Sequence, residues 1–135
     1  MNVNKERMLN EFYELIRIPC STGDEREVAD VLKKRLKKLG AQDVKEDDAG
    51  SKINGNAGNI IATFGATMEG LPTVAFTAHM DCVEPCAGIE PVLKDGVITS
   101  KGDTILGGDD KSGVAAILEG LRLMKEHSLP HGKIV

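Results

Sequence analysis

A short apolar segment near the middle of the chain constrains its fold most. Residues 73–78 are all apolar or β-branched, a composition typical of a central strand that is covered on both faces of a parallel sheet. On either side of this segment, helical and strand patterns alternate along the chain. Such alternation favours an α/β fold, namely a helix–sheet–helix sandwich with a mainly parallel sheet.

Three helices are predicted from apolar residues that recur at helical spacing. The first occupies the N-terminal region and ends before Pro19, because a proline ring interrupts the helical hydrogen bonds. The second has Thr22 or Asp24 as its candidate N-cap and ends at Gly40. The third begins near Lys111, and its broad apolar face predicts that it packs deeply against the rest of the domain.

Several shorter strands accompany the central one. Residues 44–46 have the pattern of an edge strand, and residues 59–64 that of a second strand. The dipeptide Asp95-Gly96 separates two further strand-like runs, which predicts a small hairpin. Residues 133–135 resemble the beginning of another strand, so we expect this sequence to be a fragment of a longer chain.

The composition excludes several classes of partner. A net charge of -4 disfavours nucleic acid and anionic membranes, which bind basic surfaces. The first residues lack the apolar core of a signal peptide, and no apolar run is long enough to span a membrane. Three cysteines cannot all pair within one chain, which indicates a reducing compartment, and we expect the protein to be cytoplasmic.

His79 and Asp81 follow the central apolar segment directly. Side chains two positions apart lie on the same face of a strand, and open α/β sheets bind ligands at the carboxyl ends of their strands. An imidazole and a carboxylate suit zinc and similar divalent ions. Taken alone, this pair is a weak signal, because polar residues often end a strand without binding anything.

A second candidate lies in residues 107–113, Gly-Gly-Asp-Asp-Lys-Ser-Gly. The two glycines allow a tight turn and a close approach of the backbone to another group. The adjacent carboxylates of Asp109 and Asp110 repel each other unless a cation compensates them, a role open to Lys111 or to a metal ion. The plain alternative is that the helix dipole alone favours acidic residues at this position.

Two other kinds of site are excluded. A phosphate-binding loop requires a glycine directly before the lysine, where this chain has Asp110. Cys82 and Cys86 have the spacing of half a zinc–thiolate site, but the sequence contains no second cysteine pair. We therefore expect these two cysteines to be free thiols, either buried or in a loop.

Taken together, the motifs resemble those of the zinc-dependent exopeptidase family of peptidase T and aminoacylase. The matching segments are Thr-Ala-His-Met-Asp at 77–81, the Gly-Gly-Asp-Asp-Lys-Ser-Gly loop at 107–113, and Ile-Pro-Cys-Ser-Thr-Gly at 18–23 with Glu25. The similarity extends over essentially the whole chain and is strongest to the peptidase T-like branch. It implies a dinuclear zinc aminopeptidase that hydrolyses short peptides with metal-activated water, and Co²⁺ or Mn²⁺ are alternatives to Zn²⁺.

The same resemblance implies roles for individual side chains. His79 is the implied ligand of one metal ion, and Asp109 the implied bridge between two. Asp81 is implied to be the catalytic-site carboxylate that holds the imidazole in its metal-binding tautomer. Asp110 is implied to support the loop rather than to bind metal.

The family's other catalytic residues are not found in these 135 residues. The resemblance implies a Glu-Glu pair that includes the general base, a further Asp, a final His and an inserted lid or dimerisation domain, so a homo-oligomer is also an expectation. We therefore expect residues 1–135 to be the N-terminal part of a metallopeptidase catalytic domain, and the isolated chain to be inactive. The alternative is a stand-alone metal-binding or protein-interaction module that reuses this half of the fold.

Overall fold

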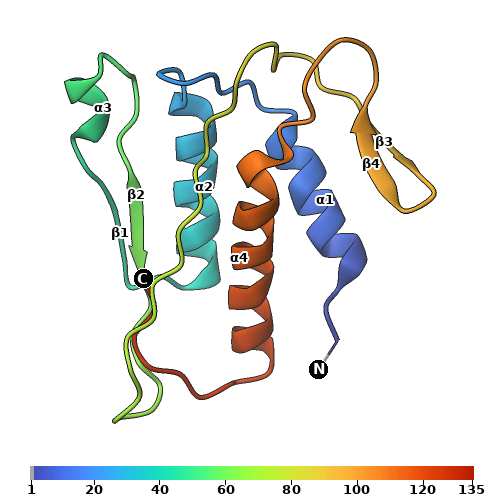
Figure 1. Ribbon diagram of the computed structural model, residues 1–135. Coiled ribbons are helices and arrows are strands. Elements are labelled where there is room, and N and C mark those ends of the chain that lie inside the picture. The colour runs from blue at the N-terminus through green and yellow to red at the C-terminus, as the bar shows by residue number, and fades with distance from the viewer. Residues whose placement is uncertain (1) are drawn as a thin grey trace.

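The structure is a computed structural model that describes residues 2–135. In these residues three long helices pack beside one another, and two small sheets lie at opposite sides of them (Figure 1). The elements are, in chain order, α1 (Lys5–Ile16), α2 (Arg26–Leu39), β1 (Asp43–Glu46), α3 (Ala49–Lys52), β2 (Ile60–Thr63), β3 (Pro91–Lys94), β4 (Val97–Ser100) and α4 (Gly108–Glu126).

The core lies where the three long helices meet, because each presents an apolar face there. Leu15 and Ile16 of α1, Val28 of α2 and Leu118 of α4 are all buried in it. The three predicted helices are thus confirmed. None of the helices in residues 2–135 is long and apolar enough to cross a membrane.

An ion pair with a buried carboxylate helps to tie α1 to α4. Glu119, almost fully buried in α4, accepts hydrogen bonds at 2.8 Å from both Nε and Nη2 of Arg7. The backbone N–H of Asn4 donates to the same carboxylate at 3.3 Å. Because a buried carboxylate is costly unless it is paired and hydrogen-bonded, this arrangement fixes how the first helix sits on the last.

The ends of the helices agree with the sequence in part. Gly40 follows α2 in the left-handed region with φ 103°, as the predicted stop requires. The predicted N-cap is wrong: Glu25 precedes α2 and its side chain does not cap the helix, while the N–H of Arg26 donates to Oδ1 of Asn56 at 2.8 Å. The Thr22 hydroxyl donates to Oδ2 of Asp81, 59 positions away.

Both sheets in residues 2–135 are two-stranded and antiparallel. β1 pairs with β2 in the register Asp43–Thr63 to Glu46–Ile60. β3 pairs with β4 through a turn at Asp95 and Gly96, whose φ angles are 51° and 80°. Positive φ at both positions is the geometry of a two-residue hairpin turn, so the predicted Asp-Gly hairpin is confirmed.

The α/β class is confirmed, but the expected mainly parallel sheet is not observed. Residues 73–78 form no strand, and only Val74 takes part in an isolated parallel bridge, to Ile134. Val74 and Phe76 are 43% and 52% exposed, so this segment is not covered on both faces. The physical reason is that a strand needs a neighbour along its length.

Residues 133–135 supply a neighbour for the first part of that segment. The N–H of Val74 donates to Lys133 at 2.9 Å, and that of Phe76 donates to Val135 at 2.9 Å. On the other side, Phe64 and Ile134 exchange both of their backbone hydrogen bonds. Residues 133–135 therefore lie between the end of β2 and the segment that leads to His79.

Candidate functional site

The structure brings the three predicted site residues together at one place. The Nδ1 atom of His79 lies 3.0 Å from Oδ1 of Asp81, and its Nε2 atom lies 3.0 Å from Oδ1 of Asp109. The side chains of His79 and Asp109 are 52% and 98% exposed. The imidazole therefore sits between two carboxylates on an accessible surface.

Asp81 is held in place from its far side. The Thr22 hydroxyl donates to Oδ2 of Asp81 at 2.6 Å, while Oδ1 faces His79. The bond from Thr22 lowers the pKa of Asp81, with a smaller contribution from His79, against a desolvation effect that raises it. The sequence had offered Thr22 only as a helix cap, although it lies in the 18–23 segment that carries part of the family resemblance.

The loop before α4 presents Asp109 and turns Asp110 inward. Asp109 and Asp110 have non-helical backbone angles and are joined by a cis peptide bond, so regular helix begins at Lys111. Oδ1 of Asp110 accepts a hydrogen bond from the N–H of Gly113 at 3.0 Å, which satisfies a free donor of the first turn. A Cβ at Gly113 would lie 2.4 Å from that oxygen, so the close approach needs a glycine.

Lys111 does not compensate the two carboxylates, contrary to one reading of the sequence. Its side chain is fully buried, and Nζ donates to Sγ of Cys20 at 2.8 Å, on the inner side of the loop. His79 is the hydrogen-bond partner of the Asp109 side chain in the described residues. The hydrogen bond to Asp109 raises the pKa of His79, desolvation lowers it, and the bond to Asp81 raises it again.

The facing atoms of His79 and Asp109 fit the requirements of a divalent metal ion in part. Two ligand atoms 3.0 Å apart can both lie about 2.0–2.1 Å from one ion, the usual distance of zinc to nitrogen and oxygen ligands. The bond from Nδ1 to Asp81 leaves Nε2 as the ligand atom. Within residues 2–135 no group of three or more His, Cys, Asp or Glu side chains is placed to hold a metal ion. The described residues therefore offer two candidate ligand atoms, fewer than the four of a tetrahedral zinc site.

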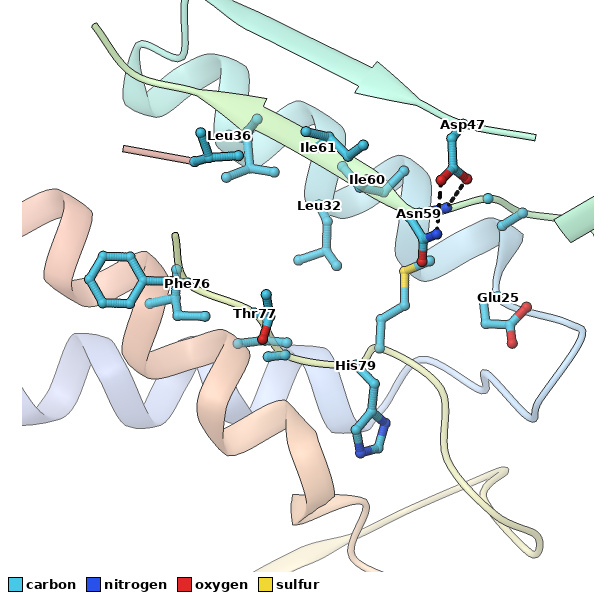
Figure 2. A pocket seen from close by; sticks show the side chains of 18 of the residues that line it. Glu25, Leu32, Leu36, Asp47, Asn59, Ile60, Ile61, Phe76, Thr77 and His79 are labelled. Carbon is cyan, nitrogen blue, oxygen red and sulfur yellow. Dashed lines mark hydrogen bonds between the residues drawn. The ribbon is translucent and has the colours of Figure 1, made fainter. Parts of the chain in front are cut away.

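Two hollows adjoin His79. A cavity of about 310 Å³ is lined by His79, Asp81, Asp109 and Cys82. A longer apolar groove of about 590 Å³ runs from the other side of the histidine between α2, α4 and β2. Figure 2 shows Leu32 of α2 facing this groove, with His79 at one end of it.

Comparisons with known proteins agree with the geometry. No model of a protein family matches the chain. A solved structure of aminopeptidase PepT from Bacillus cereus has a TM-score of 0.94 and 47% identity over 98% of this chain and 35% of its own. A tripeptidase from Staphylococcus aureus has a TM-score of 0.93 and 44% identity, with the same coverage. Peptidase T from Shewanella sediminis is 30% identical over 96% of this chain and 40% of its own length.

The chain thus spans about a third of the length of the relatives that it matches, from 35% to 40%. The resemblance to peptidase T is confirmed over nearly all of this chain, and so is the fold. The roles of individual residues and the identity of any metal stay predictions.

Proposed function

We propose that the protein carrying this chain is a metal-dependent aminopeptidase of the peptidase T kind, acting on short peptides in the cytoplasm. The observation that carries the proposal is the placement of His79 between Asp81 and Asp109, in a chain that superposes on an aminopeptidase at a TM-score of 0.94. The similar structures are described as an aminopeptidase and a tripeptidase, which supports peptides of a few residues as substrates.

In this proposal Nε2 of His79 and the carboxylate of Asp109 would hold Zn²⁺, and Asp109 would also serve a second ion. Asp81 accepts a hydrogen bond from Nδ1–H of His79, which fixes the tautomer whose Nε2 is free to bind. Zn²⁺ held there would supply an activated water molecule and polarise the scissile carbonyl group. The high exposure of Asp109 leaves it accessible to two ions at once.

The remaining ligands and the general base belong, in this proposal, to the part of the relatives that the chain does not match. A general base contributes about 10²–10⁴-fold to such reactions, so residues 1–135 alone should show no turnover. Buried free thiols at all three cysteines support a reducing compartment.

Metal removal from the intact protein tests the proposal. Purified protein is dialysed against a chelator, assayed on an unmodified tripeptide, and assayed again after addition of Zn²⁺, Co²⁺ or Mn²⁺. The expected result is loss of hydrolysis on chelation and its recovery with at least one of these ions. Full activity after complete metal removal, verified by elemental analysis, would overturn the metal-dependent mechanism. No peptide hydrolysis under any condition, with the metal bound, would favour a metal-binding module instead.

A further inference from the structure

A second cluster of reactive side chains lies behind the candidate site. Cys20, Cys82 and Cys86 are all buried, with exposures of 0%, 5% and 1%. Lys111 reaches into the same cluster and is itself only 1% exposed. The peptidase proposal assigns no task to any of these side chains.

Two of the thiols are already adjacent. The Sγ atoms of Cys20 and Cys82 lie 3.3 Å apart, and the N–H of Cys82 donates to the carbonyl of Cys20 at 3.0 Å. A parallel bridge joins Ser21 to Cys82, so the two backbones run side by side. The close approach of the two sulfurs and the direct backbone hydrogen bond between the two residues suit a covalent link.

A metal ion fits this cluster poorly. Lys111 donates to Sγ of Cys20, which places a positively charged group where a cation would have to bind. Desolvation, together with the neighbouring thiols of Cys20 and Cys86, raises the pKa of Cys82 to about 12, so it is protonated at neutral pH. A protonated thiol is not a metal ligand. The cluster therefore favours slow thiol–disulfide exchange over metal binding, since the same raised pKa leaves little of the Cys82 thiolate that attacks a disulfide.

We propose that Cys20 and Cys82 are a reversible thiol–disulfide pair, oxidised by low-molecular-weight disulfides such as oxidised glutathione. The thiolate of Cys82, which lines the cavity beside His79, attacks the small disulfide, forms a mixed disulfide and releases one small thiol. The sulfur of Cys20 then attacks the Cys82 sulfur and releases the second small thiol. Two protein thiols are oxidised, one small disulfide is reduced to two thiols, and the two protein protons pass to the leaving groups.

The cavity beside His79 supplies the path for the oxidant. Cys82 forms part of its wall together with Asp109, and the cavity measures about 310 Å³. Cys82 therefore lines the same cavity as the candidate metal ligands His79 and Asp109.

The disulfide has a consequence for the loop that carries Asp109. A disulfide bond is about 2.05 Å long, so the two sulfurs must approach each other from 3.3 Å. The bonded sulfur of Cys20 becomes a poorer acceptor, and the buried Nζ of Lys111 loses its hydrogen-bond partner. Because Lys111 is the first regular residue of α4 after Asp109 and Asp110, we expect oxidation to displace this loop.

Mass mapping of the intact protein tests the pair. The folded protein is equilibrated with oxidised glutathione, denatured, alkylated and digested with trypsin, with reduced protein as reference. We expect a loss of about two alkylatable thiols per chain and a link between the peptides 18–26 and 53–94, reversed by dithiothreitol. Since peptide 53–94 contains both Cys82 and Cys86, fragmentation of the linked peptide identifies the partner.

Variants supply the controls. Cys86→Ser should keep the link, whereas Cys20→Ser and Cys82→Ser should each remove it. The link in the unsubstituted protein is the primary readout, so a variant that fails to fold does not affect the test. Full alkylation of Cys20 and Cys82 after oxidation, a glutathione adduct that never resolves, or a link to Cys86 would each overturn the proposal. None of these readouts depends on peptidase activity, so the test is separate from that of the proposed function.

Discussion

The Nε2 atom of His79 lies 3.0 Å from Oδ1 of Asp109, although the two residues are 30 positions apart in the chain. The histidine follows an extended segment, and the aspartate precedes the regular part of a helix. Two unrelated pieces of local structure thus place a nitrogen and an oxygen where one cation can reach both.

Substitution of the facing pair should change the metal content. In the intact protein we expect His79→Ala and Asp109→Ala each to abolish peptide hydrolysis. Asp109→Ala should lower bound zinc more than His79→Ala, because a bridging carboxylate serves two ions. Asp110→Asn should retain the metal, since Asp110 bonds to the backbone of Gly113.

Elemental analysis of the purified variants measures this directly. Glu69→Ala, at an exposed loop position, is the matched control for removal of an acidic side chain. Unchanged zinc stoichiometry in Asp109→Ala would show that Asp109 is only an acidic residue favoured by the helix dipole.

The Thr22 hydroxyl should matter for catalysis through Asp81. Thr22→Val removes the donor to Oδ2 of Asp81 at nearly constant volume, so the carboxylate loses an anchor. Groups that orient a metal ligand are worth about 10–100-fold in affinity or activity, and we expect a loss at the lower end of that range. Thr22→Ser, which keeps the hydroxyl, should stay near the unsubstituted value. Equal zinc affinity in both variants, measured by competition with a chromophoric chelator, would contradict this role.

Helix α4 should tolerate an added methyl group poorly at Gly113, in its first turn, and well at Gly120, in its interior. A Cβ at Gly113 meets Oδ1 of Asp110 at 2.4 Å, whereas nothing lies within 4 Å of a Cβ at Gly120. Gly120→Ala should stabilise the protein by about 0.5–1 kcal/mol. Gly113→Ala gains the same helical preference but loses the Asp110 bond, which as an N-terminal cap is worth about 0.5–2 kcal/mol.

Urea unfolding of both variants compares the two glycines. We expect Gly113→Ala to be the less stable of the two and to bind less metal. Equal gains in stability would show that Asp110 does not hold this turn.

Glu46 should make the free energy of unfolding depend on pH in the acidic range. It accepts bonds from Arg26 at 2.7 and 2.9 Å, from Lys33 at 2.7 Å, and from the N–H of Gly58 at 3.1 Å. These bonds, those of Arg26 first, hold the pKa of Glu46 well below its ordinary value. A carboxyl whose pKa is lower in the folded state stabilises the fold above its unfolded pKa, about 4.3. That stabilisation is lost as the pH falls from there through the folded pKa.

Glu46→Gln should therefore cost about 1–3 kcal/mol at neutral pH, and progressively less as the pH falls below about 4. Unfolding free energies measured with urea from pH 7 to pH 2.5 give the comparison. Glu69→Gln, at a position without these partners, provides the reference. A difference that stays constant over this range would mean that the charge of Glu46 does not contribute.

The structural features that were predicted correctly from the sequence are mostly those determined by residues close together in the chain. Local preferences determine three such features: the helix that buries Leu15 and Ile16, the end of α2 at Gly40 and the turn at Asp95. The structure agrees with each of them. The meeting of His79 and Asp109 was also predicted, because both motifs together resembled one family.

The predictions that failed concern residues whose partners lie far away in the sequence. Residues 73–78 have the composition of a central strand, but backbone partners reach only the first part of the segment. The hydrogen-bond partner of Lys111 could not be predicted from the acidic residues beside it, because its acceptor, Cys20, lies 91 positions earlier. The Thr22 hydroxyl likewise donates to Asp81, 59 positions away, and Thr22 is not the N-cap of α2.

The segment that carries His79 is fixed by its backbone on both sides of the histidine, at Phe76 through Val135 and at Cys82 through Cys20. Only a few residues separate these two anchors, so the imidazole has little freedom to wander from Asp109. Folding has therefore already met much of the conformational entropy cost of assembling this pair of candidate ligands. Cation affinity should consequently follow the strength of the two anchors, and a change at either one would weaken binding without altering any atom that touches the ion.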